Sequence, residues 1–225
     1  MRTLAILPVK SFGAAKQRLA PALGAGSRQA LAQAMFLDVL ATLRHTPGVD
    51  SMAVVTADPV AEEAARGERV RVLRDTEQAG QSAAASIGIA FALASGFERA
   101  LLVPGDTPLV DAGELAGLLA RARSVSVVPD RHGTGTNALV LTPPDAIEPS
   151  FGPGSRERHV AAAIAAGFEP DVEELPSLML DVDTGDDLAE LASRLRECHG
   201  QAPSTRGALR QLDRLRASRE PALPA

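Results

Sequence analysis

Three acidic residues stand where apolar runs of the sequence end. The stretch LLVPGDTPLV offers one carboxylate, Asp106, and LDVDTGDD places Asp181 and Asp183 two positions apart. A buried carboxylate is costly unless a cation or several hydrogen bonds meet it, so Asp106 either fixes a turn or helix start or holds a positive group. In an extended strand Asp181 and Asp183 project from one face, which suits a hard cation such as Mg²⁺. The alternative is that Asp183 caps the following helix together with Thr184.

Basic residues cluster after the first apolar run. Lys10, Lys16 and Arg18 occur close together in VKSFGAAKQRLAP. This density directly after an expected strand favours contacts to phosphate groups. The alternative is a set of solvated loop charges.

Two Gly-rich stretches, HGTGTNAL and FGPGS, lie on either side of a later apolar run. They offer small hydroxyls and backbone amides, and the second leads into a helix expected to begin near Ser155. Helix N-termini attract phosphate through their unpaired N–H groups and the helix dipole. Thr136, Gly152 and Ser155 are therefore candidates for a second anion site, and ordinary turns are the alternative.

The elements that must position these residues alternate along the chain. Short, continuous apolar runs alternate with Ala- and Leu-rich helical segments, the pattern of an α/β fold with a mostly parallel sheet flanked by helices. Strands are expected over residues 3–9, 52–56, 70–74, 100–103, 125–128, 138–141 and 178–182. Helices are expected over residues 27–43, with Ser27 as N-cap, and over 59–66, 82–95, 111–123, 155–166 and 186–197.

This order places the polar stretches at one edge of the sheet. Ligands of open α/β sheets bind beyond the carboxyl ends of the strands. The turn Gly80-Gln81-Ser82 follows the third expected strand and leads into a helix. The cations, the acids and the Gly-rich turns would then share one rim, which predicts a polyphosphate site with a metal ion.

Composition bounds the remaining possibilities. The chain has 225 residues, 45% of them hydrophobic, and we expect one domain over residues 1–198 followed by a basic, Pro-containing tail over 199–225. The tail is expected to be peripheral or disordered, with partner binding as the alternative. A net charge of −5 and the absence of Trp and Tyr argue against nucleic-acid binding. No signal peptide or membrane span is visible, so we expect a cytoplasmic protein, and Ala-rich helical surfaces would permit a homodimer.

Several reactive arrangements are missing from the sequence. Cys198 is the only cysteine, which excludes a disulfide within the chain and disfavours a Cys-based zinc site. The four histidines are scattered, and neither a catalytic triad nor a general base emerges.

The quoted motifs together resemble a known family. LPVKSFGAAKQRL, VPGDTPLV, GTGTNAL, FGPGS and LDVDT are similar to the guanylyltransferases of coenzyme F-420 biosynthesis, which act on phosphoenolpyruvate or 2-phospho-L-lactate. The resemblance runs from residue 3 to about residue 197 and implies a nucleotidyltransferase-type (Rossmann-like) fold, GTP as nucleotide and Mg²⁺ as cofactor.

The resemblance also implies roles for individual positions. It implies metal binding by Asp106, Asp181 and Asp183, acceptor binding by Thr136, Gly152 and Ser155, and nucleotide binding by Lys10, Lys16, Arg18, Gly80 and Ser82. Of these, Lys10, Arg18 and Asp106 are the expected catalytic residues. Many members carry Gly-Leu-Asn where this chain has Gly80-Gln81-Ser82, so the resemblance does not assign the contacts to guanine or ribose.

The expected chemistry needs no deprotonating residue. The phosphate of the acceptor is already a nucleophile near neutral pH, so catalysis is mostly positioning and charge neutralisation. Phosphoenolpyruvate is the preferred acceptor. The alternatives are a nucleotidyltransferase for a sugar phosphate or molybdopterin, whose usual Leu-x-Gly-Gly pattern is missing, a glycosyltransferase that uses Asp-x-Asp, and a non-catalytic nucleotide-binding regulator.

Overall fold

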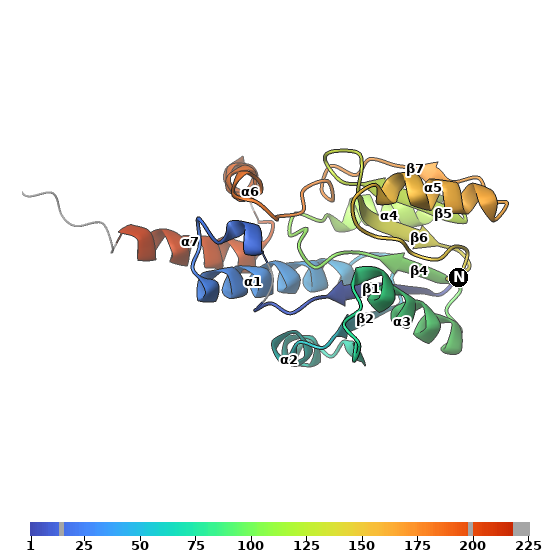
Figure 1. Ribbon diagram of the computed structural model, residues 1–225, viewed down its shortest axis with the longest axis horizontal. Coiled ribbons are helices and arrows are strands. Elements are labelled where there is room, and N and C mark those ends of the chain that lie inside the picture. Colours follow the sequence, from blue (N-terminus) through green and yellow to red (C-terminus); the bar gives the residue numbers. More distant parts are fainter. Residues whose placement is uncertain (14–15, 198–199, 218–225) are drawn as a thin grey trace, which may run out of the picture.

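The computed structural model describes residues 1–13, 16–197 and 200–217 (Figure 1). Within these residues one sheet has the strand order β3-β2-β1-β4-β6-β5-β7. Its strands are β1 (Thr3–Val9), β2 (Ser51–Thr56), β3 (Arg71–Arg74), β4 (Arg99–Leu102), β5 (Val125–Pro129), β6 (Thr136–Leu141) and β7 (Asp171–Val172). The helices are η1 (Gln17–Leu19), α1 (Ala25–Arg44), α2 (Pro59–Gly67), α3 (Gln81–Ala94), α4 (Ala112–Arg121), α5 (Ser155–Ala165), α6 (Gly185–Glu197) and α7 (Pro203–Ala217).

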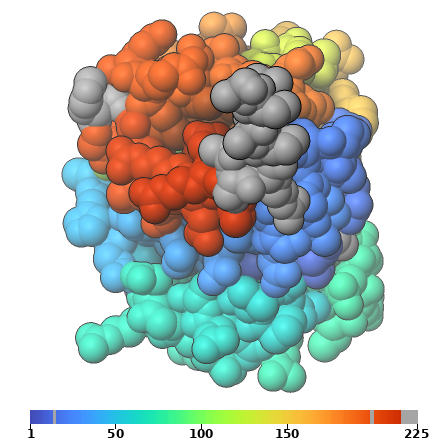
Figure 2. All heavy atoms as spheres, turned by 90° about the vertical axis from the view of Figure 1, so that its left-hand side faces the viewer, coloured from blue at the N-terminus to red at the C-terminus, as the bar shows by residue number. Residues whose placement is uncertain are grey.

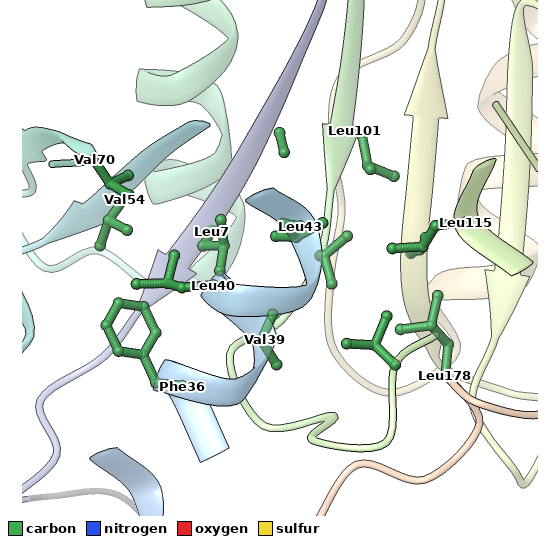
Figure 3. Close-up of a cluster of buried hydrophobic side chains, with 14 of the residues drawn as sticks. Leu7, Phe36, Val39, Leu40, Leu43, Val54, Val70, Leu101, Leu115 and Leu178 are labelled. Atoms are coloured by element: carbon green, nitrogen blue, oxygen red, sulfur yellow. The ribbon is translucent and has the colours of Figure 1, made fainter. Parts of the chain in front are cut away.

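Two hydrophobic clusters cover the two faces of the sheet. Alternate residues of β1 point to opposite faces, so Leu7 belongs to the cluster under α1, α2 and α4, whereas Ile6 belongs to the cluster under α3 and α5. Figure 3 shows the first cluster, with Phe36 and Leu40 of α1 beside Leu7. On the other face α3 lies so close to β1 that a Cβ atom on Gly88 would come within 2.3 Å of the Ile6 side chain. The apolar runs of the central strands β1, β4, β5 and β6 are therefore buried on both faces.

The pairing of β6 decides which segments share the rim of the sheet. β4 runs parallel to β1, but β6 runs antiparallel to β4, with Leu102 opposite Leu139. The beginning of β6 therefore lies at the same edge as the end of β4. Thr136, the first residue of β6, and Asp106, four residues beyond β4, are brought to one rim although the two strands run in opposite directions.

Two expectations about elements are wrong. Residues 178–182 do not form a strand, because this segment is tied to the loop after β4, where the N–H of Val182 donates to the carbonyl of Asp106 at 3.2 Å. The seventh strand is instead the short β7. Ser27 is not an N-cap, because α1 begins one turn earlier behind Gly24, whose carbonyl accepts the N–H of Arg28.

Residues 203–217 of the expected tail are a helix at the surface of the domain. They form α7, which packs along α1, and Figure 2 shows this segment lying over the N-terminal part of the chain. Leu209 and Leu212 of α7 contact a cluster that includes Leu31 and Met35 of α1. These apolar contacts hold α7 against α1. The expected boundary at residues 198–199 and the last eight residues lie outside the described part.

No helix in the described ranges is both long and apolar enough to span a membrane.

Asp38 of α1 fixes the start of α7, because its buried carboxylate accepts the N–H groups of Ser204 and Thr205 at 3.0 and 2.7 Å. We predict that Asp38→Ala costs about 1–2 kcal/mol in the free energy of unfolding, since these N–H groups lose their cap. Hydrogen exchange should become faster over residues 203–217 first. The exposed Asp213→Ala is the matched control, and unchanged exchange in Asp38→Ala would contradict the assignment.

Candidate functional site

One buried ammonium group joins two of the three predicted acids. The Nζ of Lys16 contacts Oδ2 of Asp106 and lies 2.8 Å from Oδ1 of Asp183. Burial lowers the pKa of Lys16, but the charges of Asp106 and Asp183 outweigh this, and the net pKa is raised. Lys16 is therefore charged at any physiological pH, and its side chain is only 6% exposed.

The third acid lies in the electrostatic field of the other two. Burial raises the pKa of Asp181, the charges of Asp106 and Asp183 add to this rise, and the Asn137 amide opposes it from 3.2 Å. Oδ1 of Asp106 is buried without a hydrogen-bond partner in the structure. Two acidic side chains thus meet one ammonium group, a third lies in their field, and the site retains negative charge that is not fully compensated.

The carboxylates are not arranged as a finished metal site. Among the described residues, no group of three His, Cys, Asp or Glu side chains is positioned to hold a metal ion. The Lys16 ammonium lies between two of the acids. The chemistry of the donor set nevertheless fits a hard divalent cation, since all its candidate ligands are carboxylate oxygens and one of these is buried without a partner.

A capping arrangement at the start of α6 positions Asp183. Oδ2 of Asp187 accepts the N–H groups of Asp183 and Thr184 and the hydroxyl of Thr184, while the Thr184 hydroxyl accepts the N–H of Asp187. Arg131, from the loop between β5 and β6, pairs with the other oxygen of Asp187 at 2.5 Å. Thr184 and Asp187 therefore cap the helix, and the carboxylate of Asp183 is left to bind Lys16.

A cavity of about 570 Å³ opens beside the acids. This volume is within the range of small-molecule sites. Its lining includes the three predicted cations and three acids: Lys10, Lys16, Arg18, Asp75, Asp106 and Asp183. In the part of the chain that the structure describes, neither Lys10 nor Arg18 forms an ion pair. The cavity thus has a cationic side formed by the loop after β1.

The N-terminus of α3 forms another wall of this cavity. Gly80 and Gln81 line it, and Gly80 is the N-cap with a φ of 108°, a conformation that favours glycine. Ser82 behaves differently, because its hydroxyl accepts the N–H of Phe151 at 2.9 Å. Of the two nucleotide-binding candidates in this turn, Gly80 therefore lines the cavity, whereas Ser82 anchors the FGPGS loop.

The second predicted anion site forms a separate hydrogen-bonded group. Thr136 Oγ1 lies 3.1 Å from the Ser155 hydroxyl and 3.0 Å from Nδ1 of His159, and all three side chains are buried. Gly152 is exposed and has a φ of 107°. Thr136, Gly152 and Ser155 are not among the described residues that line the 570 Å³ cavity. The structure thus brings the hydroxyls together at the start of α5 and keeps them distinct from the cationic loop.

Asn137 connects this group to the acids. It follows Thr136 on β6 and is 5% exposed, and its side-chain amide donates to Asp181 Oδ1 and, at 2.8 Å, to the carbonyl of Leu178. Four residues of this network were not predicted from the sequence: Asn137, Arg131, Asp187 and His159. A polar residue at the start of a buried strand is the one signal that would have indicated Asn137.

Comparisons with known proteins identify the family of this chain. A family described as "Guanylyl transferase CofC like" matches residues 3–222. A phosphoenolpyruvate guanylyltransferase of Conexibacter woesei is 50% identical over 216 residues, which cover 94% of this chain and 97% of the relative. A 2-phospho-L-lactate guanylyltransferase of Methanothermobacter thermautotrophicus is 34% identical, with 98% and 100% covered.

Solved structures share the fold. A nucleotidyl transferase from Methanothermobacter superimposes with a TM-score of 0.63 at 21% identity, covering 88% of this chain and 99% of that one. A CMP:2-keto-3-deoxy-manno-octonic acid synthetase in complex with CTP gives a TM-score of 0.60 at 11% identity, covering 88% and 99%. At these identities the likeness establishes the nucleotidyltransferase-type α/β fold predicted from the sequence.

The buried histidine predicts a pH dependence of stability. Burial, with a smaller contribution from the Arg158 charge, lowers the pKa of His159 to about 4 from 6.5. Between these values the unfolded chain binds a proton that the native protein does not, so stability falls as the pH decreases from 6.5 to 4, by up to roughly 3 kcal/mol. Denaturant unfolding at a series of pH values measures this.

In the same titration the His159→Asn variant should lose the decrease in unfolding free energy between pH 6.5 and 4 that His159 causes, because asparagine does not titrate. The control His45→Asn, at an exposed histidine, should keep it. Equal slopes for the wild type and His159→Asn would contradict the pKa assignment.

Proposed function

Because the chain belongs to the CofC-like guanylyl transferase family, we propose that it joins GMP from GTP to phosphoenolpyruvate and releases diphosphate, with Mg²⁺ as cofactor. The product is an enolpyruvyl diphosphoguanosine, a precursor of the deazaflavin coenzyme F-420. The name and extent of the Conexibacter relative support phosphoenolpyruvate as acceptor, and 2-phospho-L-lactate is the alternative. The observation that carries the proposal is the cluster of acids around Lys16 beside a cavity with a cationic side.

The reaction is an exchange of phosphoanhydride bonds. An oxygen of the acceptor phosphate attacks the α-phosphorus of GTP, the bond from that phosphorus to the β-phosphate oxygen breaks, and diphosphate leaves with the bonding electrons. The attacking oxygen is already ionised near neutral pH. The site therefore has to bring two polyanions together and neutralise their charge, and it needs no general base.

The nucleotide occupies the 570 Å³ cavity in this proposal. Lys10 and Arg18 line it and supply positive charge toward the departing diphosphate. The N-terminus of α3, at Gly80 and Gln81, presents backbone N–H groups and the positive end of the helix dipole. Lys16 lies at the border between this cavity and the acids and can neutralise phosphate as well as carboxylate charge.

The acceptor binds at the beginning of α5. Thr136 and Ser155 supply hydroxyls there, and Gly152 supplies an exposed backbone without a side chain. The dipole of the 11-residue helix favours an anion at its N-terminus. Asn137 links this group to Asp181, so the acceptor lies next to the acids.

Asp106, Asp181 and Asp183 are the residues that would hold Mg²⁺. The unpartnered Oδ1 of Asp106 and the raised pKa of Asp181 indicate negative charge that a cation would relieve. Bound there, the ion would neutralise phosphate charge and help to align both reactants. Asp187 and Asn137 hold Asp183 and Asp181 in place for this purpose.

An assay with the purified protein tests the function directly. With GTP, Mg²⁺ and phosphoenolpyruvate we predict release of diphosphate and formation of a guanylylated product, both abolished when the metal is chelated. Each acceptor is supplied in turn, and the diphosphate is measured by a coupled assay and the product by mass spectrometry. Diphosphate release with a sugar phosphate alone would contradict the proposal, and tight GTP binding without turnover would favour a regulator.

In the same assay Asp183→Asn provides the site control. Removal of one preorganised electrostatic group is expected to lower kcat on the order of 10²–10³-fold. Asp213→Asn, on the exposed face of α7, should leave the rate unchanged.

A further inference from the structure

His159 is a buried residue whose two ring nitrogens both have partners. The N–H of Ser150 donates to Nε2 at 2.9 Å, and Nδ1 lies 3.0 Å from the hydroxyl of Thr136. A backbone N–H can only donate, so Nε2 must carry a lone pair and no hydrogen. The neutral ring then carries its hydrogen on Nδ1 and donates it to Thr136.

This tautomer determines whether the Thr136–Ser155 pair has a hydroxyl hydrogen left to donate to a ligand. Thr136 Oγ1 receives the hydrogen bond from His159, so its own hydrogen cannot point to the ring. The two hydroxyls have two hydrogens, and their mutual contact of 3.1 Å uses one. One hydroxyl hydrogen therefore remains for a ligand. With the other tautomer Thr136 would donate to the ring, Ser155 would donate to Thr136, and no hydrogen would remain.

We propose that His159 is a positioning residue for the acceptor substrate. Its Nε2 accepts the N–H of Ser150, so its hydrogen is on Nδ1 and is donated to Thr136. The Thr136–Ser155 pair can then donate a hydroxyl hydrogen to an anionic oxygen of the ligand. The inference rests on the proposed function, since it concerns the site assigned above to the phosphorylated carboxylic acid. It also makes the site selective. A ligand must present a hydrogen-bond acceptor to this pair, as a phosphate or carboxylate does, and a group that can only donate is excluded.

The ring is fixed by more than its two hydrogen bonds. Phe151 packs against it edge-on, with ring centroids 5.3 Å apart and planes at 73°. The neighbouring Arg158 holds the same loop from outside through the side chain and carbonyl of Ser150 and the carbonyl of Pro153. Ring and loop are thus held together, so the hydroxyl pair is oriented before any ligand arrives.

The pKa of His159, lowered to about 4 mainly by burial, agrees with this geometry. A protonated ring would carry a hydrogen on Nε2 and direct it against the N–H of Ser150. The neutral ring is therefore the form that this loop accommodates.

The tautomer can be measured without any substrate. In protein labelled with ¹⁵N in its histidines, the two nitrogens of His159, identified by their loss in His159→Asn, should show a protonated Nδ1 and an unprotonated Nε2 at pH 7. A hydrogen on Nε2, or a doubly protonated ring, would overturn the proposal. This result does not depend on whether the guanylyl transfer assay succeeds.

Kinetics of variants test the consequence. His159→Leu removes the donor to Thr136, and we expect the KM for phosphoenolpyruvate to rise about 10-fold or more, as for loss of a hydrogen bond to a charged group, with less than a twofold change in the KM for GTP. His45→Asn should change neither value.

A double variant separates positioning from simple packing. Thr136→Val removes the hydroxyl through which His159 acts, so His159→Leu should raise the acceptor KM little further in that background. The same fold-change in both backgrounds would overturn the proposal, as would an unchanged acceptor KM in an active His159→Leu enzyme.

If His159→Leu does not fold, the ¹⁵N measurement decides. If the wild type transfers no guanylyl group, the proposed function fails, and the tautomer is still confirmed or refuted by the ¹⁵N measurement.

Discussion

The ion pairs that the ammonium group of Lys16 forms with Asp106 and Asp183 are the interaction on which the arrangement of the rim depends. It joins the loop after β1, the loop after β4 and the turn before α6, which are far apart along the chain. A buried ion pair adds little net stability, because desolvation consumes most of the Coulombic gain. An apolar contact would join these segments at least as well. Two carboxylates and a lysine at the wall of a cavity are best explained by the binding of charged ligands there.

The antiparallel strand β6 brings the two halves of the site together. A purely parallel sheet would send the beginning of this strand to the opposite edge, away from Asp106. As built, Thr136 and Asn137 are consecutive residues at the rim, one bonded to Ser155 and His159 and the other to Asp181. The Thr136–Ser155 pair and the acids are therefore positioned by the same strand. The cavity proposed for the nucleotide, on the β1 side, is completed by α3, and the hydroxyl of Ser82 ties α3 to the FGPGS loop.

The sequence predicted most strands of the sheet and the rim they share, but not the conformation of residues 178–182 or the role of His159. Continuous apolar runs identified β1, β2 and β5, and the rule that polar residues gather beyond strand ends placed Asp106 and Lys16 at one rim. Residues 178–182 were apolar enough to resemble a strand, but they are held by hydrogen bonds to a loop and to Asn137, which local pattern does not encode. His159 was one of four scattered histidines without a predicted role, because its hydrogen-bond partners lie 9 and 23 residues away along the chain.

The most direct test of the account is an anomalous diffraction measurement on crystals grown with a non-hydrolysable GTP analogue and Mn²⁺. The account predicts an anomalous peak in contact with the carboxylates of Asp106, Asp181 and Asp183, with the analogue's phosphates against Lys10 and Arg18. A bound analogue with the metal elsewhere, and with Lys16 still between Asp106 and Asp183, would contradict it.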